Sequence, residues 1–192
     1  MCRVSPVCQG TGRYVSCEQD FAYFHENLKH HACPFCAREG FLIRHGYVYG
    51  YDRGSPERKC RGRRFFCSNR NLRKGCGRTF SILFSHCLRR RQVNAPMLWK
   101  FVCYIAQGRS IKAAWERVTS VFSLHTGYRL WRTWRGCQFQ LRSFLCRILA
   151  PPQMGEHSCP LAQVIHHLKA AFSSATCPAS AYQVYFQQPL LA

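Results

Sequence analysis

The chain has 192 residues and a net charge of +20, because 28 Lys and Arg residues stand against only 8 Asp and Glu residues. Its length suits one ordinary domain or two small ones, and its 47% hydrophobic content excludes wholesale disorder. A charge excess of this size predicts a polyanionic partner, with nucleic acid ahead of a membrane surface and of a merely solvated basic face.

The chain contains 14 cysteines, a number that in a small secreted protein would indicate a disulfide framework. The first residues, Met1–Pro6, lead into polar sequence rather than into the apolar run of a signal peptide. No apolar run approaches the length of a membrane span. We therefore expect a cytoplasmic protein with no membrane partner, in which a few thiols bind a metal and the others are ordinary core residues.

Four segments are expected along the chain, and together they predict an α+β fold. The first is irregular over Met1–Ser16 and carries a short helix at 18–29. The full set is an N-terminal extension at 1–32, a small zinc-ribbon β domain at 33–91, an all-α helix-turn-helix domain at 92–150, and a C-terminal amphipathic helix and tail at 151–192.

Two cysteine pairs define the expected ribbon. Cys33 and Cys36 are separated by two residues, a spacing that lets two thiolates bind one Zn²⁺ from a tight turn. Cys67 and Cys76 form the second pair, with a longer spacer of eight residues. Strands are expected between and after the pairs, at 41–51, 58–66 and 79–84. Four thiolates would close the coordination sphere of one zinc ion, so its role would be structural.

Other residues are alternatives for the ligand set. Cys60 lies six residues before Cys67 and competes with it, and three histidines precede the first pair. These histidines, which we interpret as surface residues rather than ligands, are His25, His30 and His31. A further alternative is that the cysteines are unligated buried thiols.

The middle of the chain carries most of the charge. From Arg53 to Arg91 there are thirteen Lys and Arg residues and one acid, Glu57. We expect phosphate contacts from the second strand and the Cys67–Cys76 spacer. The residues concerned are Arg58, Arg61, Arg63, Arg64, Arg73 and Lys74. The aromatic residues of these strands are interpreted as sheet packing rather than as base-stacking groups.

Three capped helical patterns follow, at 94–106, 110–118 and 123–135. Their order, with short turns between them, is the layout of a helix-turn-helix. The third helix carries a stripe of arginines and would place its N-terminal residues near base edges. The residues expected to contact DNA are His125, Thr126, Arg129, Arg132 and Arg135. The alternative is a core helix with a solvated basic side.

The end of the chain is nearly uncharged. A further amphipathic helix is expected at 159–172, and the aromatic, apolar tail at 181–191 is expected to pack back on the protein or to bind a partner. That partner can be another protein or a second copy of the chain.

Several phrases of the sequence resemble the amino-terminal region of bacterial insertion-sequence transposases, a zinc ribbon followed by a helix-turn-helix. The phrases are Cys33-Pro34-Phe35-Cys36, Arg44-His45-Gly46, Arg64-Phe65-Phe66-Cys67, Cys76-Gly77-Arg78-Thr79-Phe80-Ser81 and Gly108-Arg109-Ser110-Ile111-Lys112-Ala113-Ala114, with Ser123 and Arg132 after them. The resemblance covers roughly 33–135 and implies DNA binding, with zinc as the cofactor and the nucleoid as the location.

The sequence departs from that family in two ways. The family's second cysteine pair has two residues between its members, whereas this chain has eight. The family cuts DNA with a carboxylate-bound metal pair in a downstream domain, whereas after Glu57 this chain has only Glu116 and Glu156. We therefore expect a DNA-binding protein with no catalytic residues. The alternatives are a transposase subunit completed by another chain and a scaffold that binds protein through its tail.

Overall fold

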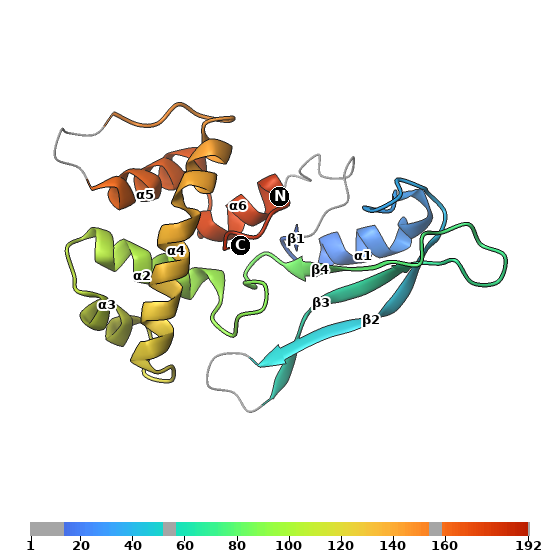
Figure 1. Cartoon of the computed structure of the whole chain (residues 1–192), viewed down its shortest axis with the longest axis horizontal. Coiled ribbons are helices and arrows are strands. Elements are labelled where there is room, and N and C mark those ends of the chain that lie inside the picture. Colours follow the sequence, from blue (N-terminus) through green and yellow to red (C-terminus); the bar gives the residue numbers. More distant parts are fainter. Residues whose placement is uncertain (1–13, 52–56, 154–158, 192) are drawn as a thin grey trace. The chain divides into compact units, whose positions relative to one another are not determined.

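A computed structural model describes residues 14–51, 57–153 and 159–191 (Figure 1). The chain divides into two compact units, Met1–Ser85 and His86–Ala192, here called unit 1 and unit 2. The fold class is α+β, as expected: a mixed sheet lies in unit 1, and a group of helices makes up unit 2. Within the described ranges, no helix is both long and apolar enough to cross a membrane.

The sheet of unit 1 has four strands in the order β1-β4-β3-β2. They are β1 (Tyr14–Val15), β2 (Leu42–Tyr51), β3 (Arg58–Cys67) and β4 (Thr79–Phe84). The β2–β3 and β3–β4 pairs are antiparallel, and β1 pairs in parallel with β4. The three long strands lie where alternation and aromatic content predicted them. The expectation that Met1–Ser16 is irregular is wrong at Tyr14–Val15, because parallel pairing with β4 orders this short strand; residues 1–13 lie outside the described part.

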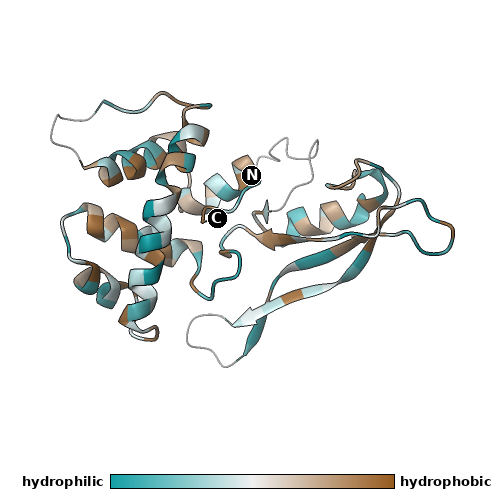
Figure 2. Ribbon diagram, in the orientation of Figure 1, coloured by the Kyte–Doolittle hydropathy of each residue, from teal (hydrophilic) through white to brown (hydrophobic). Residues whose placement is uncertain are grey.

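One helix covers part of the sheet of unit 1. Helix α1 (Glu18–Glu26) is followed by a single 3₁₀ turn, η1 (Leu28–His30). Two phenylalanines of α1 reach the sheet: the Phe21 ring lies 5.3 Å from Phe84, and the Phe24 ring lies 5.0 Å from Phe65, both edge-on. Figure 2 shows these hydrophobic positions in brown along α1 and hydrophilic colours over the outer part of β3. The core of unit 1 is therefore confined to the part of the sheet around Phe65 and Phe84, beneath α1.

The described part of unit 2 has five helices as its regular elements, with one isolated bridge between Cys87 and Asn94 before them. Its helices are α2 (Ala95–Ala106), α3 (Ile111–Val118), α4 (Leu124–Leu145), α5 (Pro160–Ala171) and α6 (Pro178–Phe186). The expected caps are present: Asn94 Oδ1 accepts from the Met97 N–H at 2.8 Å, and Ser110 Oγ accepts from the Ala113 N–H at 3.2 Å. The basic third helix runs beyond the expected 123–135 and ends at Leu145.

The end of the chain packs back on unit 2. Tyr182, Leu190 and Leu191 are buried in the core that α2, α4 and α5 also line. Gln183 is wholly buried, donates to the Cys87 carbonyl at 3.2 Å and accepts from the Leu190 N–H at 3.1 Å. These bonds tie α6 both to the start of the unit and to the last described residues. Helix α6 itself was not predicted, although Pro178 at its first position is a known helix-start signal.

Candidate metal centre and basic surfaces

Four cysteine sulfurs converge at one end of the sheet. The Sγ atoms of Cys33, Cys36, Cys67 and Cys76 all lie within 4.8 Å of one another. Cys33 and Cys76 are 3.6 Å apart, and Cys36 and Cys67 are 3.8 Å apart, sulfur to sulfur. A tetrahedral ion with metal–sulfur bonds of about 2.3 Å requires sulfurs separated by about 3.8 Å. The cluster therefore has the spacing that can hold one metal ion.

The first pair sits in a turn built by three hydrogen bonds from backbone N–H groups, one to a sulfur and two to carbonyls. The Phe35 N–H points to Cys33 Sγ at 3.4 Å. The Ala37 N–H donates to the Cys33 carbonyl at 2.9 Å, and the Cys33 N–H donates to the Arg38 carbonyl at 2.9 Å. Ala37 adopts a left-handed conformation, with φ of 56°. The turn thus folds the chain back immediately after Cys36, so that both sulfurs point to the same side.

The second pair repeats the two backbone–backbone bonds of this turn, and its third bond also ends on the first sulfur of the pair. The Cys76 N–H points to Cys67 Sγ at 3.3 Å. The Gly77 N–H donates to the Cys67 carbonyl at 2.9 Å, and the Cys67 N–H donates to the Arg78 carbonyl at 2.9 Å. Gly77 has φ of 71° and so matches Ala37 in the first turn. The two pairs are therefore equivalent knuckles, despite spacers of two and eight residues.

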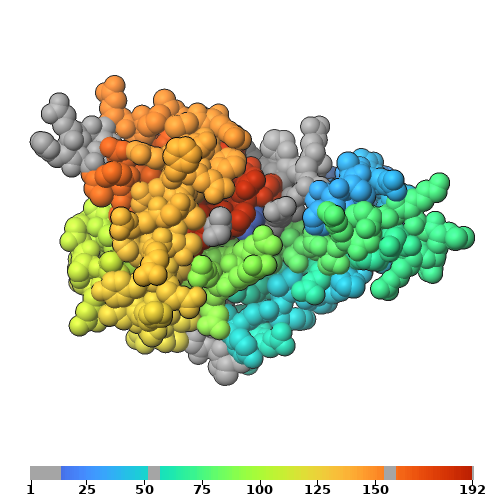
Figure 3. All heavy atoms as spheres, in the orientation of Figure 1, coloured from blue at the N-terminus to red at the C-terminus, as the bar shows by residue number. Residues whose placement is uncertain are grey.

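The eight-residue spacer, Ser68–Gly75, is a loop added to the second knuckle without changing it. The Gly75 N–H donates to the Ser68 carbonyl at 2.9 Å and closes the loop at its base. A Cβ on Gly75 would lie 2.2 Å from that carbonyl oxygen, so only glycine fits. The Arg38 guanidinium, after the first knuckle, donates to the Lys74 carbonyl. The loop stands out from the edge of unit 1 (Figure 3). This closure is the physical reason why a long spacer is compatible with the ligand set.

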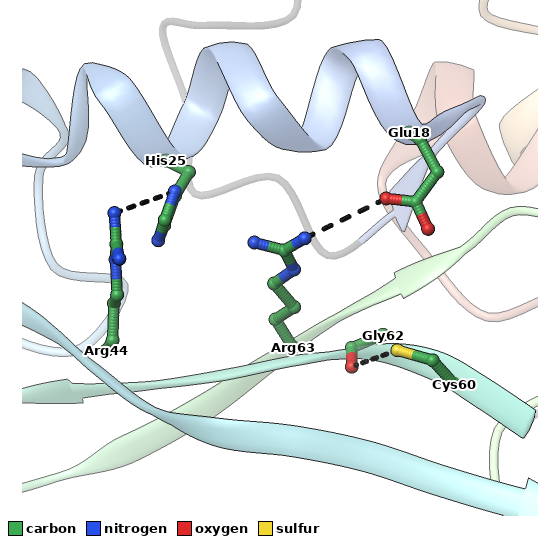
Figure 4. A network of polar contacts seen from close by, with 6 residues as sticks. All are labelled: Glu18, His25, Arg44, Cys60, Gly62 and Arg63. Carbon is green, nitrogen blue, oxygen red and sulfur yellow. Dashed lines mark hydrogen bonds and ion pairs between the residues drawn. The ribbon is translucent and has the colours of Figure 1, made fainter.

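The rival ligands lie elsewhere. Cys60 Sγ donates to the Gly62 carbonyl at 3.4 Å on β3, and His25 Nδ1 is 2.9 Å from the guanidinium of Arg44 (Figure 4). His31 stacks on Phe24 with ring centroids 4.2 Å apart. It is therefore half-buried, and the interpretation of His31 as a surface residue is wrong. His30 is exposed. Across the described residues, the four-cysteine group is the cluster with metal-ligand spacing.

The environment of the thiols differs from one to the next. Burial raises the pKa of Cys67 to about 12 and also raises the pKa of Cys33. A hydrogen bond from the Arg38 N–H lowers the pKa of Cys36 to about 7. Buried thiols of this kind become thiolates when a cation lies beside them. A metal that binds here at neutral pH must therefore displace the protons of Cys33 and Cys67.

The predicted phosphate-contacting residues of unit 1 fall into two places. Arg58, Arg61, Arg63 and Arg64 lie along β3, whereas Arg73 and Lys74 are exposed on the Ser68–Gly75 loop. Arg58 and Arg64 are also exposed. Arg63 is held toward α1, with its guanidinium 3.9 Å from Glu18 and over the Phe21 ring (Figure 4). Arg61 is half-buried and packs over Gly50.

The predicted reading residues lie on one stripe of α4. His125, Arg129, Arg132 and Arg135 are exposed, and Thr126 is half-buried. On the opposite side, Leu130 and Trp134 are buried in the core of unit 2. The stripe is therefore fixed to face solvent by the packing of the other side.

A tight contact sets the start of α4 against α3. Gly127 is buried, and a Cβ there would lie 2.8 Å from the Trp115 ring. Trp115 Nε1–H donates to the carbonyls of Phe122 and Ser123 at 3.1 and 3.0 Å. These contacts fix the turn between the two helices, so the N-terminal end of α4 is held in one direction.

Three exposed tyrosines were missed as functional candidates. Tyr47, Tyr49 and Tyr51 lie on β2 and were expected to pack in the sheet, yet each is about half exposed. The aromatic residues that do pack are Phe65 and Phe66 on β3. Strict alternation from Tyr47 to Tyr51, opposite a strand of arginines rather than of apolar residues, is the sequence signal that could have separated the two groups.

No protein-family model matches the chain, and no curated protein or solved structure shows a significant match to it.

Proposed function

We propose that the chain is a zinc-dependent, sequence-specific DNA-binding protein, a ribbon joined to a helix-turn-helix, related to the DNA-binding regions of insertion-sequence transposases. The observation that carries the proposal is the exposed stripe of α4. It presents His125, Arg129, Arg132 and Arg135 to solvent while the start of the helix is held against Trp115. Helix α4 contains no acidic residue, so nothing on it opposes a polyanion.

Helix α4 would enter the major groove by its N-terminal part. There His125 and Thr126 would meet base edges, and Arg129 can donate two hydrogen bonds to guanine. Arg132 and Arg135 lie one and two turns further along the helix and would contact phosphates. This division follows from the general geometry of a recognition helix, whose first residues reach deepest.

Unit 1 would add phosphate contacts that carry no sequence information. Arg58 and Arg64 on β3, with Arg73 and Lys74 on the loop, supply exposed cations. Zinc would be held by Cys33, Cys36, Cys67 and Cys76, and with four thiolates it would leave no position for a reacting water. Its role would be to join the two knuckles.

Selection from a pool of random-sequence duplexes tests the reading role of α4. The zinc-loaded protein should enrich a common sequence, and its affinity for that duplex should fall steeply with salt. Arg129→Gln should abolish the enrichment or relax it at one position, at a cost of about 1–3 kcal/mol on the selected duplex. Arg132→Gln should weaken all duplexes alike and reduce the salt slope by about one.

Lys169→Gln is the matched control, because it removes one exposed charge from α5 without touching the stripe. It should leave the enriched sequence and its affinity nearly unchanged. Equal losses with Lys169→Gln and Arg129→Gln, or binding that does not respond to salt, would contradict the proposal.

A further part of the proposal is that the chain binds DNA without cutting it. Two-metal cleavage needs two or three converging acids. In unit 2 the acids are Glu116, exposed on α3, and Glu156, which lies outside the described residues. Supercoiled plasmid incubated with the protein and Mg²⁺ should stay intact. Nicking that disappears on Glu116→Gln or Glu156→Gln would instead identify a transposase subunit.

A further inference from the structure

The second half of β2, from Tyr47 to Tyr51, presents a row of aromatic rings to solvent. Tyr47, Tyr49 and Tyr51 are 54%, 49% and 48% exposed. They alternate along the strand, and alternate residues point to the same face. The rings of Tyr47 and Tyr49 are 5.8 Å apart and inclined at 41°. The row therefore lies on an exposed part of the sheet face, next to the part that α1 covers.

Two arginines hold this row in place. The Arg63 guanidinium lies 5.4 Å from the Tyr47 ring centroid and 5.0 Å from that of Phe21, so Tyr47 and α1 share one face of the sheet. The Arg58 guanidinium lies 5.8 Å from the Tyr49 ring centroid. Cation–π contacts of this kind fix rings that would otherwise rotate freely.

The charge around the row suits an anionic ligand. Strand β3 pairs with β2 along its length and places Arg63 opposite Tyr47, Lys59 opposite Gly50 and Arg58 opposite Tyr51. Among the described residues two carboxylates lie nearby: Glu18 pairs with Arg63, and Glu57 precedes Arg58; Asp52, which follows Tyr51 in the sequence, lies outside the described residues. On the face of the row, β3 contributes Arg58 and Arg63, whereas Lys59 and Arg64 pair with residues of β2 that point to the other face.

The spacing of the row suits unpaired bases. Residues two apart on a strand are about 6.6–6.8 Å apart, so each ring meets a different base. In a duplex, successive bases are about 3.4 Å apart and already stacked on both sides. Aromatic rows beside cations bind single strands because every base has a π-face.

We propose that Tyr47, Tyr49 and Tyr51 form a stacking platform for the unpaired bases of a single DNA strand, with Arg58 on its phosphates. The inference deepens the proposed function, since it rests on DNA as the ligand of unit 1. It gives the β2–β3 hairpin a different role from α4: the helix reads paired DNA, and the hairpin holds DNA whose strands are separated.

The test compares single-strand and duplex binding of the zinc-loaded full chain. The single-strand probe is an oligonucleotide of about 12 nucleotides carrying 2-aminopurine, a fluorescent base whose emission falls on stacking. Binding should quench the probe. Tyr47→Leu with Tyr49→Leu should remove the quenching and weaken single-strand affinity at least about tenfold. Tyr47→Phe with Tyr49→Phe should keep both, because the rings remain.

Tyr23→Leu is the matched control, since Tyr23 is 53% exposed on α1 and is not part of the row. It should change neither quenching nor affinity. Single-strand binding that survives the double leucine substitution would overturn the platform. Duplex affinity separates the two proposals: if the double leucine variant keeps both duplex and single-strand binding, only the platform fails. If the unaltered protein binds no duplex, the proposed function fails.

Discussion

The two units are held together by different means. Unit 2 has a continuous apolar core that joins α2, α3, α4, α5 and α6 through large side chains such as Trp115, Trp134 and Tyr182. Unit 1 buries a smaller group beneath α1, and two of its buried residues, Cys33 and Cys67, belong to the four-cysteine cluster. Small units with limited cores commonly depend on a metal or on disulfides.

We infer from this difference that a bound metal would stabilise unit 1 rather than unit 2. The knuckles lie at the inner end of β2 and β3, next to the buried Leu42, Phe65 and Phe66. A metal ion there would join the turn after η1 to the end of β3. In the described part of unit 2, no group of residues has metal-ligand spacing. The two units should therefore respond separately to metal removal and to core substitutions.

Chelation should have the largest effect. Structural zinc in small domains contributes about 10–16 kcal/mol of apparent free energy at neutral pH, so removing it should unfold unit 1. Hydrogen exchange followed by mass spectrometry should show full exchange in β3 and β4, while α2 and α4 stay protected. Loss of protection in both units together would contradict their independence.

Trp115→Ala should produce the opposite pattern. The substitution empties a core position and removes two hydrogen bonds to the α3–α4 turn. It should destabilise unit 2 by about 3–5 kcal/mol in urea denaturation followed by helical circular dichroism. The metal content should stay unchanged, and a loss of metal would show that the units are coupled.

Acid should weaken metal binding before it affects unit 2. The raised pKa values of Cys33 and Cys67 mean that both thiols carry protons at neutral pH until a metal displaces them. Protons therefore compete with the metal below those pKa values, and affinity rises as pH rises. With about two or more protons released per ion, affinity should fall at least about a hundredfold from pH 8 to pH 7. Competition with a chromogenic chelator measures this, and a flat response would exclude thiol ligands.

The equivalent positions of the two knuckles should respond with opposite signs. Gly77→Ala places a Cβ at φ of 71° and 2.8 Å from Asn69 Nδ2, and should cost about 1–2 kcal/mol. Ala37→Gly relieves the same left-handed conformation and should stabilise unit 1 by up to about 1 kcal/mol. Urea denaturation of the metal-loaded protein checks both. A change of the same sign in both variants would show that the knuckles are not equivalent.

Sequence patterns predicted most of the regular structure because their causes are local. Alternation indicated β2 to β4, and the caps Asn94 and Ser110 indicated α2 and α3. Strand β1 could not be predicted in this way, since two residues show no periodicity and its order comes from pairing with β4. Gln183 could not be recognised as a core residue, because its burial depends on partners far away in sequence, such as the Cys87 carbonyl.

The cysteine cluster was predicted from spacing, but its geometry was not. The two-residue spacing of Cys33 and Cys36 is enough to predict a tight turn. The eight-residue spacer between Cys67 and Cys76 does not predict a particular turn. The second knuckle depends on the Gly75–Ser68 bond that closes the loop and on the Arg38–Lys74 contact from the first knuckle. Both are tertiary contacts. The exposure of Tyr47 was missed for a similar reason, since it depends on where α1 begins over the sheet.

The most direct test of the four-cysteine metal site is the metal content of the purified full chain and of three single variants, measured by native mass spectrometry. We expect one zinc ion per chain, lost in Cys33→Ser and in Cys76→Ser and kept in Cys60→Ser. Zinc retained in Cys76→Ser, or lost in Cys60→Ser, would contradict the pairing of the two knuckles around one ion.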